Sequence, residues 1–203
     1  MKLFYAPGTC AVACWTALEW VGTQYDLINV DYTSKEFQQV NPLMLVPALD
    51  TGGGQVLTQA SAILTYISEQ YPLASIGCGD SVEARSKFNE VMSFLSSDFH
   101  PSFWPFFSPQ RFTVNESSEA LEDVVGAAHV RINRVMTHLD QLVGEEGYLY
   151  LGRRSVADAY AYVMIRWTER LPKKWREYPN IARFYSLMEK DPIVKKVIQL
   201  SNA

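Results

Sequence analysis

The sequence has few cysteines, no excess of positive charge and no long apolar run. Three cysteines in 203 residues are too few, and odd in number, for a disulfide-stapled secreted fold, so they indicate free thiols in a reducing compartment. Lys and Arg number 18 against 22 Asp and Glu, and the net charge of −4 excludes a general attraction to nucleic acid or anionic membranes. No apolar run reaches the roughly 18 residues that span a bilayer.

The N-terminal segment does not resemble a signal peptide. Pro7 and Gly8 interrupt the apolar residues that precede the small residues Ala11 to Ala13, so the segment lacks a sufficient apolar core. The shares of apolar residues, 48%, and charged residues, 20%, are ordinary for a globular protein, and the length allows one large domain or two small ones. We expect a cytoplasmic protein with no membrane or nucleic-acid partner.

The first part of the chain alternates strand and helix signals. Apolar periodicity and Gly or Pro stops predict strands at residues 2–6, 25–31, 46–50 and 55–58, a helix that contains Cys14, Ala17, Leu18 and Val21, and a helix that contains Ile63, Tyr66 and Ile67. The three glycines at 52–54 predict a hairpin turn. The order is βαβ followed by ββα, in which the βαβ unit makes its two strands parallel.

The second part shows helical patterns only. One apolar stripe consists of Leu121, Val125, Ala128, Ile132, Val135, Leu139 and Leu142, and another of Val156, Tyr160, Val163, Trp167 and Leu171. Ser155 and Asp158 stand before the second stripe with the spacing of a capping box, which predicts that Asp158→Ala costs about 1 kcal/mol. Two shorter helices are expected at 178–190 and 192–200. The composition changes near residues 72–81, where we place a domain boundary.

Cys10 is the first candidate for chemistry. It follows a strand and a Pro-Gly turn and opens a helix, where unpaired N–H groups and the helix dipole favour a thiolate. A buried structural thiol is an equally good interpretation from position alone. Cys14 lies one turn further inside the apolar stripe and is expected in the core, and Cys78 falls in the linker. The sequence therefore predicts Cys10 as the reactive thiol.

Two further segments contain candidate binding groups. The Val46–Pro47 bond is either cis, which exposes neighbouring backbone groups, or trans on an edge strand. Gln59, Ala60 and Ser61 begin the third helix, whose free N–H groups provide either an anion site or a place for simple capping.

His100 adjoins a run of aromatic residues, where a packing role is favoured over a role in binding. The Pro that follows it disfavours α geometry at His100 itself. Histidines and carboxylates lack metal-ligand spacing, and the glycines at 52–54 lack the Lys and Ser or Thr of a phosphate loop. We expect neither a metal nor a nucleotide.

Together these segments resemble the glutathione transferase family, within it the bacterial Beta-like class. The resemblance rests on the opening MKLFYAPGTC, on NP followed by VPAL at 46–49, on LTQASAI at 57–63, on SVADAY at 155–160 and on the aromatic stretch around His100. It implies a thioredoxin-like α/β N-terminal domain, residues 1–74, that binds glutathione, and an all-helical domain, residues 81–203, that carries a hydrophobic substrate site. It also implies a cis Pro47 and a homodimer formed through residues 81–145 and the N-terminal domain.

The resemblance assigns roles to individual residues. Cys10 would act on the glutathione sulfur, the Val46 backbone would pair with the cysteinyl part of glutathione, and Gln59 and Ala60 would hold its γ-glutamyl end. Lys35 would reach the glycine carboxylate. The hydrophobic substrate site would comprise Tyr5, His100, Phe103 and Trp104.

Two classes of function follow from the resemblance. The first is a detoxification enzyme that uses a glutathione thiolate, or a mixed disulfide with Cys10, against hydrophobic electrophiles or disulfides; a cysteine at this position favours thiol–disulfide chemistry. The second is a non-catalytic protein of the same fold that binds hydrophobic ligands or a protein partner. Ala60, where the family has a serine, and the apolar residues at 43–45 motivate the second class.

Overall fold

A four-stranded sheet organises the first 70 residues in the computed structural model, which describes residues 1–143, 145 and 147–201. The strands are β1 (Lys2–Tyr5), β2 (Asp26–Asn29), β3 (Ala48–Asp50) and β4 (Val56–Thr58), and their order in the sheet is β2-β1-β3-β4. β1 and β2 are parallel, whereas β3 pairs antiparallel with both β1 and β4. This confirms the predicted βαβ and ββ units, with strands one to three residues shorter than expected.

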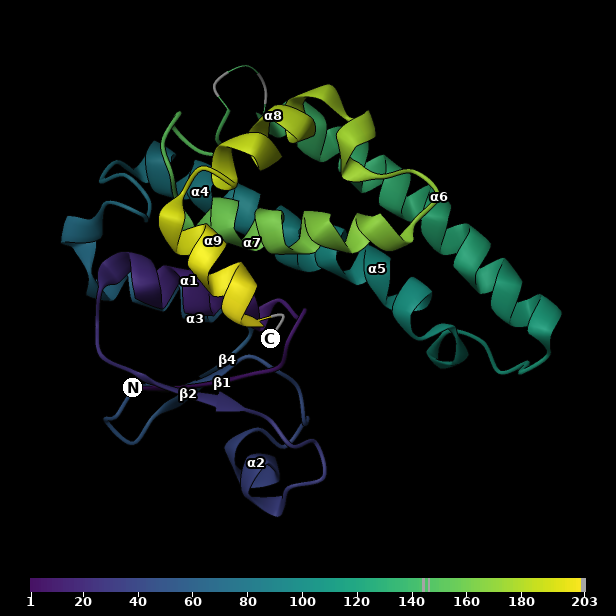
Figure 1. Cartoon of the computed structure of the whole chain (residues 1–203), viewed down its shortest axis with the longest axis horizontal. Helices are drawn as coiled ribbons and strands as arrows, with labels where there is room; N and C mark the ends of the chain where they lie inside the picture. Colours follow the sequence, from purple (N-terminus) through teal and green to yellow (C-terminus); the bar gives the residue numbers. More distant parts are fainter. Residues whose placement is uncertain (144, 146, 202–203) are drawn as a thin grey trace.

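The two faces of the sheet carry different helices (Figure 1). α1 (Ala11–Val21) and α3 (Ala60–Gln70) pack side by side on one face, toward which the alternation of β1 directs Leu3 and Tyr5. Phe4 points to the opposite face and meets Phe37 of α2 (Lys35–Val40), with ring centroids 5.9 Å apart. α2 was not predicted from the sequence, because six residues are too few to show an apolar period.

The rest of the described chain forms helices. The α-helices are α4 (Val82–Ser93), α5 (His100–Phe107), α6 (Ser118–Val143), α7 (Val156–Ile165), α8 (Pro179–Met188) and α9 (Pro192–Ser201). Short 3₁₀ turns are η1 (Pro72–Ala74), η3 (Pro109–Arg111), η4 (Arg166–Arg170) and η5 (Trp175–Glu177), and η2 (Phe94–Phe99) is a π-helical segment. The predicted fold class, a thioredoxin-like α/β part followed by a helical part, is confirmed.

α4, η2 and α5 follow one another directly, and here one expectation is wrong. His100 has φ −57° and ψ −50°, which is α geometry, although Pro101 follows it. The His100 N–H donates to the carbonyl of Leu95, five residues back, in the π pattern. The wider π turn and the position of Pro101 at the start of α5, where its missing N–H costs little, explain why the proline is tolerated.

α6 buries part of the predicted row, namely Ala128, Ile132 and Leu139, together with two residues outside it. Its buried residues are Ala128, Ile132, Met136, Leu139 and Val143, whereas Leu121, Val125, Val135 and Leu142 are only half-buried. The N-terminal end of α6, near residue 118, extends beyond the main helical layer (Figure 1). The predicted stripe therefore marks the correct helix but covers the core only along its C-terminal half.

α7 lies at the centre of the molecule and is buried along its whole length. Its capping box is confirmed: Asp158 accepts hydrogen bonds from the Ser155 N–H at 2.8 Å and the Ser155 hydroxyl at 2.7 Å. Asp158 also accepts from the Leu149 N–H at 2.9 Å and is fully buried. The helix ends at Ile165, where the predicted stripe continues as the 3₁₀ turn η4 instead.

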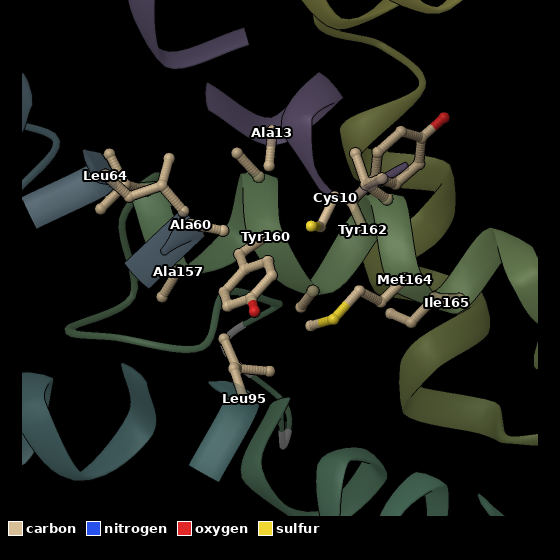
Figure 2. Close-up of a cluster of buried hydrophobic side chains, with 14 of the residues drawn as sticks. Cys10, Ala13, Ala60, Leu64, Leu95, Ala157, Tyr160, Tyr162, Met164 and Ile165 are labelled. Atoms are coloured by element: carbon tan, nitrogen blue, oxygen red, sulfur yellow. The ribbon is translucent and has the colours of Figure 1, made fainter. Parts of the chain in front are cut away.

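The α/β and helical parts share one core. α1 packs against α7 and α9, and α3 packs against α7, so buried residues from both parts form a continuous cluster. Figure 2 shows this cluster where Cys10, just before α1, and Ala60 of α3 approach Tyr160 of α7. The Trp167 indole N–H adds a hydrogen bond of 2.8 Å to the Gly8 carbonyl across the junction. No helix among the described residues is long and apolar enough to cross a membrane.

Candidate active site

A cavity of about 530 Å³ lies between the two parts of the molecule. On one side it is lined by the turn before α1, the loop before β3 and the start of α3. On the other side it is lined by η2, α5, η3, α7 and η4. The volume is that of a small-molecule site.

The cavity brings together six of the nine residues predicted for a site: Cys10, Val46, Gln59, Ala60, His100 and Trp104. These residues come from separate segments of the chain, so only the tertiary structure makes them neighbours.

The other three predicted residues do not line the cavity. Tyr5 is buried behind it and packs edge-on against Trp15 at 5.3 Å between ring centroids, because the alternation of β1 turns it toward α1. Phe103 is fully buried and contacts Trp167 from behind. Lys35 is exposed at the start of α2. Tyr5 and Phe103 therefore support the wall of the cavity from within the core.

Cys10 stands at the N-terminus of α1, as predicted, but its environment is not the one expected. Its side chain is only 6% exposed, and the thiol donates a hydrogen bond to the Val46 carbonyl at 3.8 Å. Burial raises the pKa of Cys10 to about 12, and the backbone N–H groups of the helix start offset only part of this rise. The prediction of a lowered pKa is therefore wrong, because desolvation outweighs the helix terminus.

Cys14 behaves as predicted. It is completely buried, and its thiol donates to the Ala60 carbonyl at 3.9 Å. Burial is also the main cause that raises its pKa.

The loop before β3 presents backbone groups to the cavity. The Val46–Pro47 peptide bond is cis, which confirms the expectation from the family resemblance. Asn41 holds the loop: its side-chain amide donates to the Leu45 carbonyl at 2.6 Å, and its side-chain oxygen accepts from the Leu43 N–H at 3.1 Å.

Gln59 adopts an unusual backbone conformation between β4 and α3, with φ 71° and ψ 119°. A positive φ is unfavourable for a residue with a side chain, and such residues concentrate at functional sites. Within the described chain no side chain caps the start of α3, so the capping interpretation for this segment is wrong, and Gln59 and Ala60 at this uncapped start line the cavity.

His100 faces the cavity from the helical side. Burial lowers its pKa to about 4, so the imidazole is neutral at pH 7. Its Nδ1 lies 3.0 Å from the Tyr160 hydroxyl, and burial raises the pKa of that hydroxyl. Both groups are therefore neutral hydrogen-bonding groups, and the rings of Trp104 and Trp167 flank the imidazole.

Several residues of the cavity were not predicted from the sequence. Tyr160 and Trp167 belong to the apolar stripe of residues 156–171 and were assigned to the core, whereas both line the cavity. Arg111 and Arg170 also line it and gave no signal in the sequence. Arg111 ends the turn η3 after α5, and Arg170 ends the turn η4 after α7. A pattern of apolar residues does not predict where polar residues in such turns will lie.

Comparison with known proteins agrees with this geometry. The models "Glutathione S-transferase, N-terminal domain" and "Glutathione S-transferase, C-terminal domain" match residues 1–69 and 97–200. Glutathione S-transferase GST-4.5 of Xanthomonas campestris pv. campestris is 28% identical over 98% of this chain and 98% of its own length.

Two solved structures are similar over nearly the whole chain. A bacterial beta class glutathione S-transferase of Sphingomonas chungbukensis is 32% identical, with a TM-score of 0.86 over 99% of this chain and 98% of that one. A sphingomonad glutathione S-transferase complexed with glutathione is 29% identical, with a TM-score of 0.87 over 100% of this chain and 99% of that one. The fold and the site thus define a protein of the thioredoxin-like plus helical class. The chain belongs to the glutathione S-transferase family.

Proposed function

We propose that the cavity holds glutathione on its α/β side and transfers the glutathione sulfur to a hydrophobic electrophile on its helical side. One observation carries the proposal: Cys10, the cis Val46–Pro47 bond and the strained Gln59 face, across one cavity, a wall formed by Trp104, Trp167 and other aromatic residues. The sphingomonad relative with bound glutathione supports the assignment of the tripeptide.

Four residues are proposed to bind glutathione. The Val46 backbone pairs with the cysteinyl unit, and Gln59 with the Ala60 N–H at the start of α3 holds the γ-glutamyl carboxylate. An uncapped helix N-terminus is suited to an anion. Lys35, exposed at the start of α2, reaches toward the glycine carboxylate from the rim. Ala60 supplies no hydroxyl, so its N–H is the group that remains for this contact.

Cys10 is the proposed catalytic residue, in its protonated form. Its S–H donates to the Val46 carbonyl without ligand. When the Val46 backbone pairs with the cysteinyl unit, the S–H turns to the glutathione sulfur and stabilises the thiolate of glutathione. That sulfur attacks the electrophilic carbon: the C–S bond forms, the bond to the leaving group breaks and the leaving group departs with its electron pair. The thiol proton of glutathione passes to solvent. Catalysis consists of positioning and lowering the pKa of one thiol.

The hydrophobic substrate is proposed to lie against His100 and Trp104, with Phe103 supporting that wall from the core and Tyr5 packed against Trp15 on the α/β side. We also propose a division into residues 1–74 and 81–203, and a homodimer formed through residues 81–145 and the N-terminal part of the partner. The exposed apolar residues Val82 and Val130 on α4 and α6 support this interface. A cytoplasmic detoxification role fits these proposals.

Retention on immobilised glutathione, followed by a conjugation assay with 1-chloro-2,4-dinitrobenzene, tests the function. We expect retention, and turnover that Cys10→Ala lowers about tenfold or more, which corresponds to one hydrogen bond to a charged sulfur. Cys78→Ala is the matched control, because it removes a half-buried thiol that does not line the cavity, and it should leave turnover unchanged.

Other results would point elsewhere. Retention without turnover would favour the non-catalytic binding protein. A mixed disulfide on Cys10 after treatment with glutathione disulfide, found by peptide mass, would assign thiol–disulfide exchange in place of conjugation. A lack of both retention and turnover would contradict the proposed function.

A further inference from the structure

The cavity has a charge of its own, opposite in sign to that of the chain. Its only formally charged lining residues among those the structure describes are Arg111 and Arg170, and no Asp or Glu is part of the described lining. The whole chain carries a net charge of −4. Two guanidinium groups at one cavity in an acidic protein are therefore a local feature, which average composition does not explain.

Arg170 owes its position to the 3₁₀ geometry of η4. In a 3₁₀ turn residues three apart lie on the same side, so Arg170 shares a face with Trp167, whose indole lines the cavity. The Arg170 guanidinium carbon lies 5.4 Å from the ring centroid of Phe106 and 5.6 Å from that of Phe107. These rings hold the guanidinium at the cavity rim and leave its N–H edges available, since cation–π contacts engage only its face.

Arg111 ends the turn η3, which follows the same C-terminal end of α5 that contacts Arg170, and it lines the same cavity. Within the described part of the chain, neither Arg111 nor Arg170 has a carboxylate within ion-pair distance. Both side chains are exposed, so water solvates their charges and they remain available to a ligand. Both residues line the same cavity, and its volume suits a small molecule.

The rest of the cavity mouth is apolar. Leu43 is 70% exposed and Leu45 51% exposed on the α/β side, and Trp104 is 46% exposed on the helical side, and all three line the cavity. Exposed apolar surface of this kind at a cavity indicates a ligand with an apolar body. The ligand therefore needs two properties, a flat apolar body for this surface and an anionic group for the arginines.

We infer that the second substrate of this enzyme is an apolar, aromatic molecule that carries a carboxylate or a similar oxyanion, held by Arg111 and Arg170. The guanidinium fork matches the two oxygens of a carboxylate. This inference rests on the proposed function for its reaction, and names the class of substrate that the same cavity selects.

Glutathione itself has carboxylates, and it is the alternative source of the anion. Its proposed contacts, Val46, Gln59, Ala60 and Lys35, all lie on the α/β side of the molecule. Arg111 and Arg170 lie on the helical side, in η3 and η4. This placement favours the second substrate, and the experiment separates the two sources.

Binding is tested first, with a matched pair of non-reactive probes, 4-methyl-3-nitrobenzoate and 4-methyl-3-nitrobenzamide, in the presence of saturating glutathione. The two probes differ only in the charged group. By calorimetry we expect the carboxylate to bind about tenfold more tightly than the amide, a preference that one charge-assisted contact explains. The double variant Arg111→Gln/Arg170→Gln should bring this ratio close to one. Added salt should reduce it in the wild type, because both arginines are at the rim.

The matched control is Lys190→Gln/Lys195→Gln, which removes two positive charges from exposed positions outside the cavity. It should leave the ratio unchanged. An equal affinity for the two probes in the wild type would overturn the inference, as would a preference that the arginine variant retains. If the arginine variant weakens glutathione binding and keeps the probe preference, the arginines bind glutathione and the inference is wrong.

Turnover is tested separately with 4-chloro-3-nitrobenzoate and 4-chloro-3-nitrobenzamide, each rate divided by the uncatalysed rate with glutathione. We expect the carboxylate to show about tenfold the kcat/KM enhancement of the amide, with the difference mainly in KM. Turnover of neither probe would contradict the proposed function, and the calorimetric ratio would then decide the inference by itself. Turnover of both with no dependence on the arginines would contradict the inference alone.

Discussion

The two sides of the cavity present different chemical groups. The α/β side offers backbone groups and neutral residues: the Val46 carbonyl, the start of α3 beside Gln59 and the buried thiol of Cys10. The helical side offers large side chains, among them Trp104 and Arg170.

The difference shows how one fold assigns binding of a constant ligand to one side and selection of a substrate to the other. Backbone groups are fixed by strand pairing and helix ends, so the α/β side is suited to a constant ligand such as a peptide. Side chains on helices and 3₁₀ turns change without altering the backbone, so the helical side is suited to selecting a particular substrate. In this chain the side-chain wall is both aromatic and cationic.

The largest expected effect concerns the burial of the Cys10 thiol on the α/β side. Since burial raises the pKa of Cys10 from 9.0 to about 12, the fraction present as thiolate falls greatly. Alkylation of Cys10 by iodoacetamide at pH 7 should therefore be at least about a hundredfold slower than that of free N-acetylcysteine, and should accelerate about tenfold per pH unit up to pH 10. Peptide mass spectrometry follows each cysteine. Labelling as fast as the free thiol would show that the helix terminus controls this pKa.

The next effect concerns Asp158, which the sequence pattern marks as an ordinary cap. Because the carboxylate is fully buried and accepts three hydrogen bonds, Asp158→Ala leaves several buried donors without partners. We expect a loss of about 3 kcal/mol in the free energy of unfolding, measured in urea, in place of about 1 kcal/mol. Asp26→Ala, at an exposed position in β2, is the control and should change stability by less than about 0.5 kcal/mol.

The pH dependence of the same variant gives a second check. Burial raises the pKa of Asp158 from 3.8 to about 6, so the folded protein binds its proton at a higher pH than the unfolded chain does. The contribution of this carboxyl group to stability is therefore fully present below about pH 4 and decreases as the pH rises through about 6. The loss caused by Asp158→Ala should be larger at pH 4.5 than at pH 7, and the opposite trend would contradict the raised pKa.

The smallest effect concerns the junction between the two sides. Trp167→Phe keeps an aromatic ring and removes the indole hydrogen bond to the Gly8 carbonyl. We expect a loss of about 1 kcal/mol in the free energy of unfolding, and faster alkylation of Cys10, because the turn before α1 loses its tie to η4. Trp175→Phe is matched, since its indole donates to Glu169 within the helical part and should leave Cys10 labelling unchanged. Equal labelling in both variants would show that this bond does not hold the two sides together.

Local sequence signals predicted most of the fold. Strand alternation, the glycines of the hairpin and the capping box at Ser155 and Asp158 all correspond to observed elements, because each depends on neighbours within a few residues. The short helix α2 and the change from α7 to η4 were not predicted, since neither interrupts an apolar pattern in a way that the sequence displays. The cavity residues that the family motifs mark, such as Val46 and Gln59, were predicted, whereas Arg111 and Arg170 were not.

The sequence by itself determined that Cys10 opens a helix, that Val46 precedes a proline and that α7 begins with a capping box. These features depend on residue type and spacing along the chain. Only the tertiary structure decided that the Cys10 thiol is buried and protonated, and that two arginines line one cavity. It also decided that Asp158 is fully buried, so that its replacement by Ala is expected to lower the free energy of unfolding strongly. Burial and convergence depend on segments far apart in the sequence, and the free energy of a charge depends on what those segments place around it.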